Sequence, residues 1–169
     1  MGVFDFGPGA TDGFSKTRVL TPYTSSIDEL QQGASATVSD GGTFIYDSLC
    51  EILDYKNGDI QEHFQATPIT KAIVLVSDGQ DTESTVCTLD SVIAKAKSLE
   101  IPIHVIGLGT ASEQFQELFN TDESNSELIG DLRRLANETG GFYASVSSER
   151  DVVELAEIIA VGLTGGYTT

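Results

Sequence analysis

The sequence predicts an α/β domain in which helices alternate with the strands of a mostly parallel sheet. Two short runs rich in Ile and Val, residues 71–77 and 101–107, match in length and branching the strands that parallel sheets bury on both faces. Between them, apolar residues recur at helical spacing and give a helix one apolar face that can cross back over the sheet. These apolar residues are Leu89, Val92, Ile93, Ala96 and Leu99. The order of strand, helix and strand favours a doubly wound fold.

The same alternation continues toward the C-terminus. A second apolar stripe predicts a helix that ends at Gly140 and Gly141, because glycine readily adopts the left-handed conformation of a helix cap. The stripe consists of Leu128, Leu132, Leu135 and Ala136. A strand over residues 142–146 should follow, and Ser148 with Asp151 forms a capping box for a last amphipathic helix. The apolar face of that helix consists of Val152, Leu155, Ala156, Ile159 and Leu163.

The beginning of the chain has a different pattern. Residues 3–6 and 18–21 flank a glycine-containing loop, which predicts an antiparallel edge hairpin beside the mostly parallel sheet. Ser26 with Glu29 forms a capping box for a short helix, and a longer helix should open after Thr43. The apolar face of the longer helix consists of Ile45, Leu49, Ile52 and Leu53.

Length, charge and hydropathy limit the classes of partner. The chain has 169 residues, which fits a single domain over residues 1–169. It carries 26 Asp and Glu against 9 Lys and Arg, and the net charge of −17 repels the phosphates of nucleic acids and of lipid headgroups. No apolar stretch approaches the length that spanning a bilayer requires. We expect no nucleic-acid partner and no membrane insertion of this chain. The surplus of carboxylates suits cations, basic protein patches or simply a well-solvated surface.

The chain has two cysteines, Cys50 and Cys87. Two are too few for a disulfide scaffold, and each lies beside an apolar residue, where a buried thiol is stable. We interpret both as core residues. A single bridge between them stays an open alternative, and so does the redox compartment of the protein.

Two oxygen-bearing side chains are candidates for a cation site. Ligands of open parallel sheets gather outside the carboxyl ends of the strands, and Asp78 directly follows the first predicted strand of this kind. With Gly79 allowing a sharp turn, its carboxylate can offer a hard oxygen ligand to Mg²⁺ or a similar cation. Thr43 offers a hydroxyl at a helix start. The alternative for each is local: a turn before the next helix for Asp78, and a helix cap for Thr43.

The remaining polar residues favour a binding domain over an enzyme. His104 falls within a predicted buried strand and His63 in a polar segment, and a lone histidine is more often structural than catalytic. No Ser, His and Asp set and no Cys and His pair can be assembled from the sequence. Four acidic residues near the candidate site are interpreted as solvated surface charges that attract cations. They are Asp40, Asp47, Asp81 and Glu83.

Four motifs, in their order along the chain, resemble those of a von Willebrand factor A (VWA) domain. They are GGT (41–43) before an apolar helix, IVLVSDG (73–79), VIGLG (105–109) and LRRLANETGG (132–141). The resemblance runs through nearly the whole chain. It implies a Rossmann-like fold with helices on both faces of the sheet and, in many members, a metal-ion-dependent adhesion site (MIDAS).

In the family this metal site takes ligands from three loops, and Thr43 and Asp78 match the second and third of them. The first loop, Asp-x-Ser-x-Ser, should follow a strand upstream of the hairpin, but residues 1–4 align with the family's second strand. We therefore expect a domain that is truncated at its N-terminus and lacks the first strand, the first metal loop and the first helix. Residues 122–126 match the loop literally, yet the residues before them have helical spacing, and Ser124 with Glu127 forms a capping box.

The resemblance implies a protein-binding or adhesion-type module in which a carboxylate of the protein ligand completes the coordination of Mg²⁺, Ca²⁺ or Mn²⁺. Because Thr43 and Asp78 supply few oxygens, we expect weak or no metal binding by this chain and a complete site only in a longer protein. An extracellular or cell-envelope location is favoured over the cytoplasm. Two alternatives stay open: an intracellular subunit that partners an ATPase or chelatase-type assembly, and a Rossmann-like hydrolase that uses Asp78.

Overall fold

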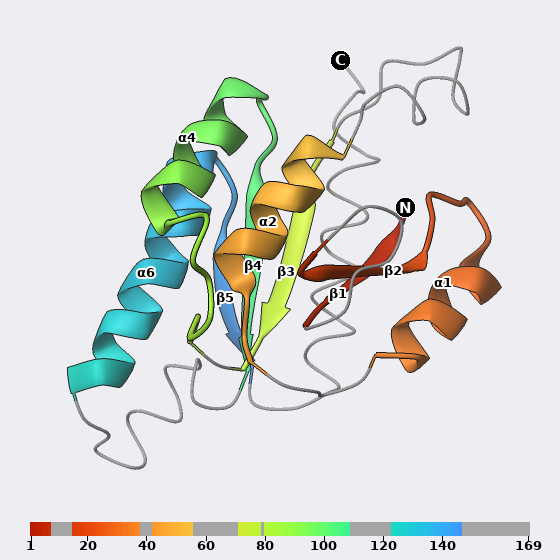
Figure 1. Cartoon of the computed structure of the whole chain (residues 1–169), viewed down its shortest axis with the longest axis horizontal. Coiled ribbons are helices and arrows are strands. Elements are labelled where there is room, and N and C mark those ends of the chain that lie inside the picture. The colour runs from red at the N-terminus through yellow and green to blue at the C-terminus, as the bar shows by residue number, and fades with distance from the viewer. Residues whose placement is uncertain (8–14, 38–41, 56–70, 79, 109–122, 147–169) are drawn as a thin grey trace. The chain divides into compact units, whose positions relative to one another are not determined.

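The computed structural model (Figure 1) describes six stretches of the chain: residues 1–7, 15–37, 42–55, 71–78, 80–108 and 123–146. Of residues 123–128 it describes the backbone alone. The chain divides into two compact units. The first consists of Met1–Thr67 with Asp81–Lys95, and the second of Pro68–Gln80 with Ala96–Thr169. Each unit is described by itself, and the prediction of a single domain over residues 1–169 stays a prediction.

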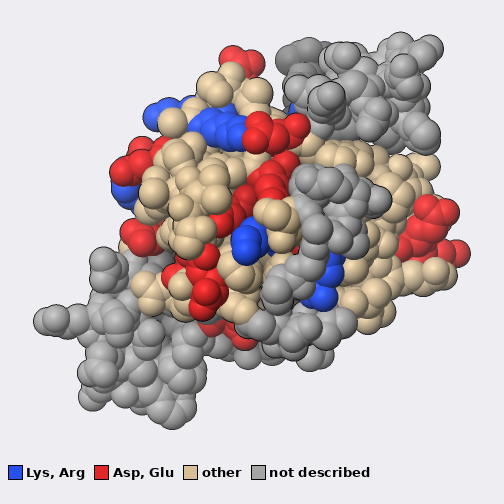
Figure 2. Space-filling view, viewed as in Figure 1, with Lys and Arg blue, Asp and Glu red and all other residues tan. Residues whose placement is uncertain are grey.

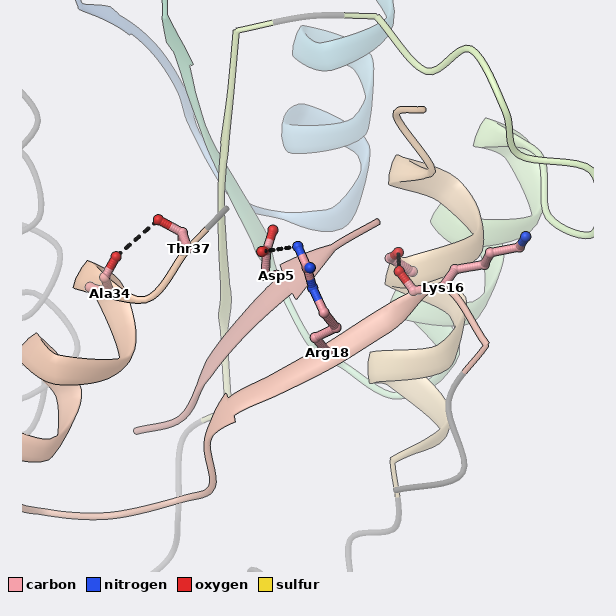
Figure 3. Close-up of polar contacts among 6 residues, drawn as sticks. Asp5, Lys16, Arg18, Ala34 and Thr37 are labelled. Atoms are coloured by element: carbon pink, nitrogen blue, oxygen red, sulfur yellow. Dashed lines mark hydrogen bonds and ion pairs between the residues drawn. The ribbon is translucent and has the colours of Figure 1, made fainter. Parts of the chain in front are cut away.

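The first unit opens with an antiparallel hairpin of β1 (Val3–Phe6) and β2 (Thr17–Thr21). The predicted hairpin is confirmed, with its second strand starting one residue earlier than expected. Arg18 on β2 donates a hydrogen bond to the carboxylate of Asp5, its register partner on β1 (Figure 3). Opposite charges on directly paired residues favour one register over its neighbours, so this ion pair helps to fix the hairpin.

The short helix α1 (Ile27–Ser35) is held at both ends by local side chains. At its start, the hydroxyl of Ser26 accepts a hydrogen bond of 3.3 Å from the backbone N–H of Glu29, as the predicted N-cap requires. After its end, the hydroxyl of Thr37 donates to the carbonyl of Ala34 at 3.0 Å (Figure 3). The cap predicted at Ser26 is confirmed, but the reciprocal half of the predicted capping box is not, because the N–H of Ser26 donates to the hydroxyl of Thr24 at 3.0 Å.

The longer helix predicted after Thr43 is α2 (Ile45–Asp54). Its buried apolar face follows the predicted spacing closely. Of the predicted residues, Ile45, Leu49 and Leu53 are buried and Ile52 is half-buried; Cys50 is buried as well. The helix therefore forms because one of its faces is removed from water, which is where most of the stability of a helix of this length originates.

Glu51 fastens the start of β2 to α2. Its carboxylate accepts hydrogen bonds from the backbone N–H and the hydroxyl of Ser15, from the N–H of Lys16 and from the hydroxyl of Thr17. In addition, the hydroxyl of Ser48 donates to the carbonyl of Lys16 at 2.8 Å. Burial by itself would raise the pKa of Glu51, but these donors outweigh it and the pKa is lowered.

The second unit contains a parallel sheet of three strands in the order β3, β4, β5 (Figure 1). The strands are β3 (Ile73–Ser77), β4 (Ile103–Leu108) and β5 (Tyr143–Val146). The first two were expected from apolar runs and the third from its place after the second predicted helix, each with its start shifted by one or two residues. Together with the helices between the strands and the antiparallel pair, this confirms the predicted Rossmann-like α/β class.

The helix predicted between the first two parallel strands is α4 (Leu89–Ser98). At its start, Thr88 and Ser91 exchange hydrogen bonds: each backbone N–H donates to the hydroxyl of the other residue. This reciprocal arrangement is the logic of a capping box. The prediction is wrong only for Leu99, which lies beyond the helix and is 38% exposed.

Burial on both faces, which the sequence predicts for β3 and β4, holds for β4 alone. On β4, Ile103, Val105 and Ile106 are 0% exposed. On β3, Val74 and Val76 are 37% and 38% exposed. Alternate residues of a strand point to opposite faces, so the two exposed valines belong to one face. The prediction is wrong for that face, because burial of a sheet face needs a layer packed on it and a strand run alone does not show whether both faces are covered.

The helix between β4 and β5 is α6 (Glu123–Thr139), which packs on both strands. It begins before Ser124, so Ser124 and Glu127 lie inside the helix and the predicted capping box at its start is wrong. The literal match to the family's metal loop at residues 122–126 therefore overlaps a helix. A helical backbone does not provide the loop geometry of that metal site.

The end of α6 follows the prediction. Gly140 adopts φ of 82°, the left-handed conformation expected of a cap. The backbone N–H of Gly141 donates to the carbonyl of Ala136 at 2.9 Å, and the chain then passes very close to β4. A Cβ added at Gly141 would lie 2.0 Å from the carbonyl oxygen of Ile103. Glycine is therefore required at position 141 by space rather than by φ.

Several predicted features lie outside the described residues. They are the last helix over residues 148–163 with Ser148 and Asp151, and the residues Asp40, His63, Gly79 and Gly109. Within the stretches that are described, no helix combines the length and the apolar character that crossing a bilayer requires.

A pair of glycine substitutions tests the packing of the second unit. We expect Gly141→Ala to destabilise the protein by at least about 2 kcal/mol, because backbone of β4 must move to admit the methyl group. Gly130→Ala in α6 is the matched control: nothing lies within 4 Å of its added Cβ, so we expect a stabilisation of up to about 1 kcal/mol. Urea unfolding of the two variants measures both values. Equal stability of Gly141→Ala and the wild type would contradict the close approach.

Candidate functional site

Asp78 is the first residue after β3, at the carboxyl end of the parallel sheet, and it is exposed. This is the position at which open α/β sheets collect ligands. Its predicted location, directly after a strand of the parallel sheet, is therefore as expected. Its role as a metal ligand stays a prediction.

Thr43 lies two residues before α2 and is half-buried. Its carbonyl accepts hydrogen bonds from the N–H groups of Thr82 at 3.0 Å and Glu83 at 3.2 Å, and its own N–H donates to the hydroxyl of Thr82 at 3.3 Å. The N-cap position of α2 is occupied by Phe44 and carries no side-chain capping bond, so the alternative of Thr43 as the helix cap is wrong. The peptide of Thr43 is instead held by a segment that is distant in the sequence.

The start of α2 is capped by that same distant segment. The carboxylate of Asp81 accepts a hydrogen bond of 2.9 Å from the N–H of Tyr46, and the hydroxyl of Ser84 accepts one of 2.9 Å from the N–H of Asp47. Asp81 also accepts from the N–H and the hydroxyl of Ser84, which fixes both caps together. An anionic cap is favourable because the N-terminus of a helix carries partial positive charge. Asp81 is therefore a helix cap, and our interpretation of it as a solvated surface charge is wrong.

Asp47, in the first turn of α2, binds the segment that caps the helix. Its side chain is only 3% exposed, and its carboxylate accepts hydrogen bonds from three consecutive N–H groups, those of Thr85 at 3.0 Å, Val86 at 3.0 Å and Cys87 at 2.6 Å. The interpretation of Asp47 as a solvated charge is wrong. Burial alone would raise the pKa of Asp47, but the three backbone donors and the positive charge of Lys16 together outweigh it and lower the pKa.

A disulfide between Cys50 and Cys87 completes the attachment. Cys50 is 7% exposed, in agreement with its predicted place in the core, whereas Cys87 is half-buried and the prediction of a core position is wrong for it. The bridge that the sequence left open is present. We use the name clasp for residues 81–87 together with their contacts to Thr43 and to the first two turns of α2. The clasp is thus held by caps at its start, by Asp47 in its second half and by the disulfide at its end.

One signal in the sequence could have indicated the clasp. Asp47 and Cys50 are three residues apart on α2, so they lie on the same side of the helix. A carboxylate on the side of a helix that buries a cysteine needs hydrogen-bond donors, because an unpaired buried charge is very costly. The identity of the donors could not be read from the sequence, since backbone N–H groups are present at every residue except proline.

The predicted metal residues are not part of a cluster that the structure describes. No group of three or more His, Cys, Asp or Glu in the described stretches could hold a metal ion. Thr43 belongs to the first unit and Asp78 to the second, so they are described separately and the site that they are predicted to share stays a prediction. Of the other acidic residues, Glu83 is exposed, as predicted.

His104 on β4 has structural partners. Its Nδ1 accepts a hydrogen bond of 3.3 Å from the N–H of Phe142, and the two rings lie 4.6 Å apart between their centroids. Burial lowers the pKa of His104, which favours the neutral ring that can accept this bond. The contacts agree with the structural role predicted for this histidine.

Comparisons with known proteins support the fold. No family model matches the sequence, and no curated protein matches it either. The structure is similar to the crystal structure of the conserved hypothetical protein BatB from Bacteroides thetaiotaomicron, with a TM-score of 0.57 and 16% identity over 88% of this chain and 75% of that chain. This likeness shows the fold alone. An uncharacterized membrane spanning protein from Vibrio fischeri gives a TM-score of 0.41 and 22% identity over 95% of this chain and 74% of that chain, which is too low to carry an argument.

Replacement of Asp47 tests the clasp through stability and pH. We expect Asp47→Asn to lower the free energy of unfolding by about 2–4 kcal/mol at pH 7, because a buried amide cannot accept all three N–H donors as well as a carboxylate does. A carboxyl whose pKa is lowered by folding stabilises the protein above its unfolded pKa of about 4, and this contribution is lost as the pH falls through the folded value. The difference between wild type and variant should therefore shrink below about pH 4.

The control for this measurement is Asp54→Asn, on the same helix. Asp54 is 70% exposed and forms a surface ion pair with Lys95, so we expect a change below about 0.5 kcal/mol. Chemical unfolding of both variants between pH 3 and pH 7, values chosen to bracket the usual aspartate pKa of about 4, gives the comparison. Equal effects of the two substitutions would rule out a special role of Asp47.

Proposed function

We propose that this chain is a protein-binding module of the VWA type rather than an enzyme. The observation that carries the proposal is the position of Asp78: an exposed carboxylate directly after β3, at the carboxyl end of a parallel sheet. In α/β folds of this kind, ligands gather outside the carboxyl ends of the strands, which is where Asp78 lies. The α/β fold and the four VWA-like motifs support the same assignment.

In this proposal Thr43 and Asp78 are two oxygen ligands of a divalent cation, Mg²⁺ or alternatively Ca²⁺ or Mn²⁺. The described residues do not form a metal centre by themselves, and two protein oxygens leave most of an octahedral shell to water. We therefore propose that this chain binds the cation weakly. In this proposal a carboxylate of the protein partner completes the coordination of the cation.

The disulfide supports an extracellular or cell-envelope location. Disulfides persist in oxidising compartments and are rare in the cytosol of most organisms, so the Cys50–Cys87 bridge favours an adhesion-type module over an intracellular partner of an ATPase or chelatase. The charge of the surface is consistent with a protein partner. Figure 2 shows Asp and Glu spread over the viewed face among fewer Lys and Arg, and the net charge of −17 disfavours nucleic acid.

Titration with cations tests the proposed site. We expect calorimetry to show Mg²⁺ binding with a dissociation constant on the order of millimolar, because few protein oxygens are supplied. Asp78→Asn and Thr43→Val should each abolish the heat of Mg²⁺ binding, since each removes one ligand oxygen and changes the size of the side chain little. Glu29→Gln is the control: it removes one negative charge from an exposed position of α1 and should leave binding unchanged.

A carboxylate probe tests the mode of partner binding. With Mg²⁺ in excess, added acetate should shift the backbone amide resonances near Thr43 and Asp78, and it should not do so in Asp78→Asn. Tight Mg²⁺ binding that survives Asp78→Asn would contradict the assignment of the ligands. Hydrolysis of a phosphate ester that is abolished by Asp78→Asn would instead favour an enzyme.

A further inference from the structure

The clasp determines where the peptide of Thr43 lies. Every hydrogen bond that the structure gives to the backbone N–H and carbonyl of Thr43 within the described residues comes from the clasp, through Thr82 and Glu83. Thr43 is separated from α2 by a single residue that has no side-chain capping bond. The position of its hydroxyl therefore depends on whether the clasp is closed.

The clasp is closed by two kinds of attachment. Its polar attachments, Asp47 and Asp81, each collect several donors on one carboxylate, so a single local opening breaks many bonds together. Its covalent attachment, the disulfide, joins residues 37 positions apart and keeps the end of the clasp against α2 even when the hydrogen bonds break. Local openings of this kind are common in loops with partly exposed hydrogen bonds. The disulfide therefore limits both the extent and the lifetime of an opening.

The same helix provides an internal comparison. Glu51 also collects several donors, from Ser15, Lys16 and Thr17, and fastens a second segment to α2. No disulfide joins that segment to the helix, since the two cysteines of the chain are bonded to each other and connect α2 to the clasp. Removal of the disulfide should affect the clasp and leave the attachment at Glu51 intact.

We propose that the Cys50–Cys87 disulfide is a redox-controlled latch: a dithiol reductant opens it, which loosens the clasp and with it the backbone of Thr43. The effect on cation binding rests on the proposed function of Thr43. The effect on the clasp itself does not.

The exchange proceeds at Cys87, which is half-buried, rather than at Cys50, which is 7% exposed. A thiolate of the reductant attacks the Sγ of Cys87, the disulfide bond breaks, and its electron pair leaves on the Sγ of Cys50, which takes up a proton. In the mixed disulfide, the second thiolate of the reductant then attacks the reductant's sulfur that is bonded to Cys87. This releases the thiolate of Cys87, which also takes up a proton. Two electrons and two protons pass from the dithiol to the protein, and the reductant leaves as its own disulfide.

Hydrogen exchange of backbone amides tests the latch in the full chain. The oxidised protein is compared with the protein reduced by dithiothreitol and with the double variant Cys50→Ser, Cys87→Ser measured without reductant. We expect the amides of Thr85 and Val86, which donate to Asp47, to exchange at least tenfold faster in both disulfide-free forms. The amides of Ser15 and Lys16, which donate to Glu51, should keep their rates.

Two results overturn the latch. Unchanged exchange at Thr85 and Val86 would show that the hydrogen bonds hold the clasp without the disulfide. Equal acceleration at Ser15 and Lys16 would show a general loss of stability rather than a local opening. Mg²⁺ titration of the oxidised protein and of the double variant separates the latch from the proposed function. Weaker Mg²⁺ binding by the double variant supports both proposals. No Mg²⁺ binding in either form, together with faster exchange in the clasp, overturns the proposed function but supports the latch.

Discussion

The buried carboxylate of Asp47 is the interaction on which the order of the first unit depends. Asp47 is 3% exposed, and a buried carboxylate is costly unless it accepts hydrogen bonds. The three consecutive backbone N–H groups from Thr85 to Cys87 need an acceptor in turn, and they donate to this carboxylate. Each satisfies the other. The carboxylate also lies in the first turn of α2, where the partial positive charge of the helix start favours an anion. A short chain segment without regular secondary structure is thereby held in one conformation.

The other polar residues of α2 extend this arrangement. Glu51 fastens the start of β2, Cys50 is bonded to the end of the clasp, and the first turn receives its caps from Asp81 and Ser84. One amphipathic helix thus contributes an apolar face to the core and anchors two segments far away in the sequence. Because the clasp also holds the peptide of Thr43, the geometry of the candidate ligand is a consequence of packing around α2 rather than of its own local sequence.

The fold and the function stand on different grounds. The parallel order of β3, β4 and β5 and the similarity to BatB establish a Rossmann-like arrangement, but folds of this class support many unrelated activities. The functional proposal rests instead on the chemistry of two side chains, the exposed carboxylate of Asp78 and the hydroxyl of Thr43, and on the few oxygens that they supply. The disulfide supports the proposed extracellular or cell-envelope location, because disulfides persist in oxidising compartments.

The sequence by itself determined the elements whose physical cause is local. The apolar runs of β3 and β4, the stripes of α2 and α6, the cap at Ser26 and the left-handed Gly140 all follow from periodicity and from the conformational preferences of single residues. Only the tertiary structure decided the exposure of Val74 and Val76, because burial depends on neighbouring elements. It also decided the roles of Asp47 and Asp81. Asp47 accepts hydrogen bonds from backbone N–H groups more than 30 residues away in the sequence, and Asp81 caps a helix start 35 residues away. Backbone groups carry no sequence signature, so a carboxylate that binds them reads as a surface charge until the chain is folded.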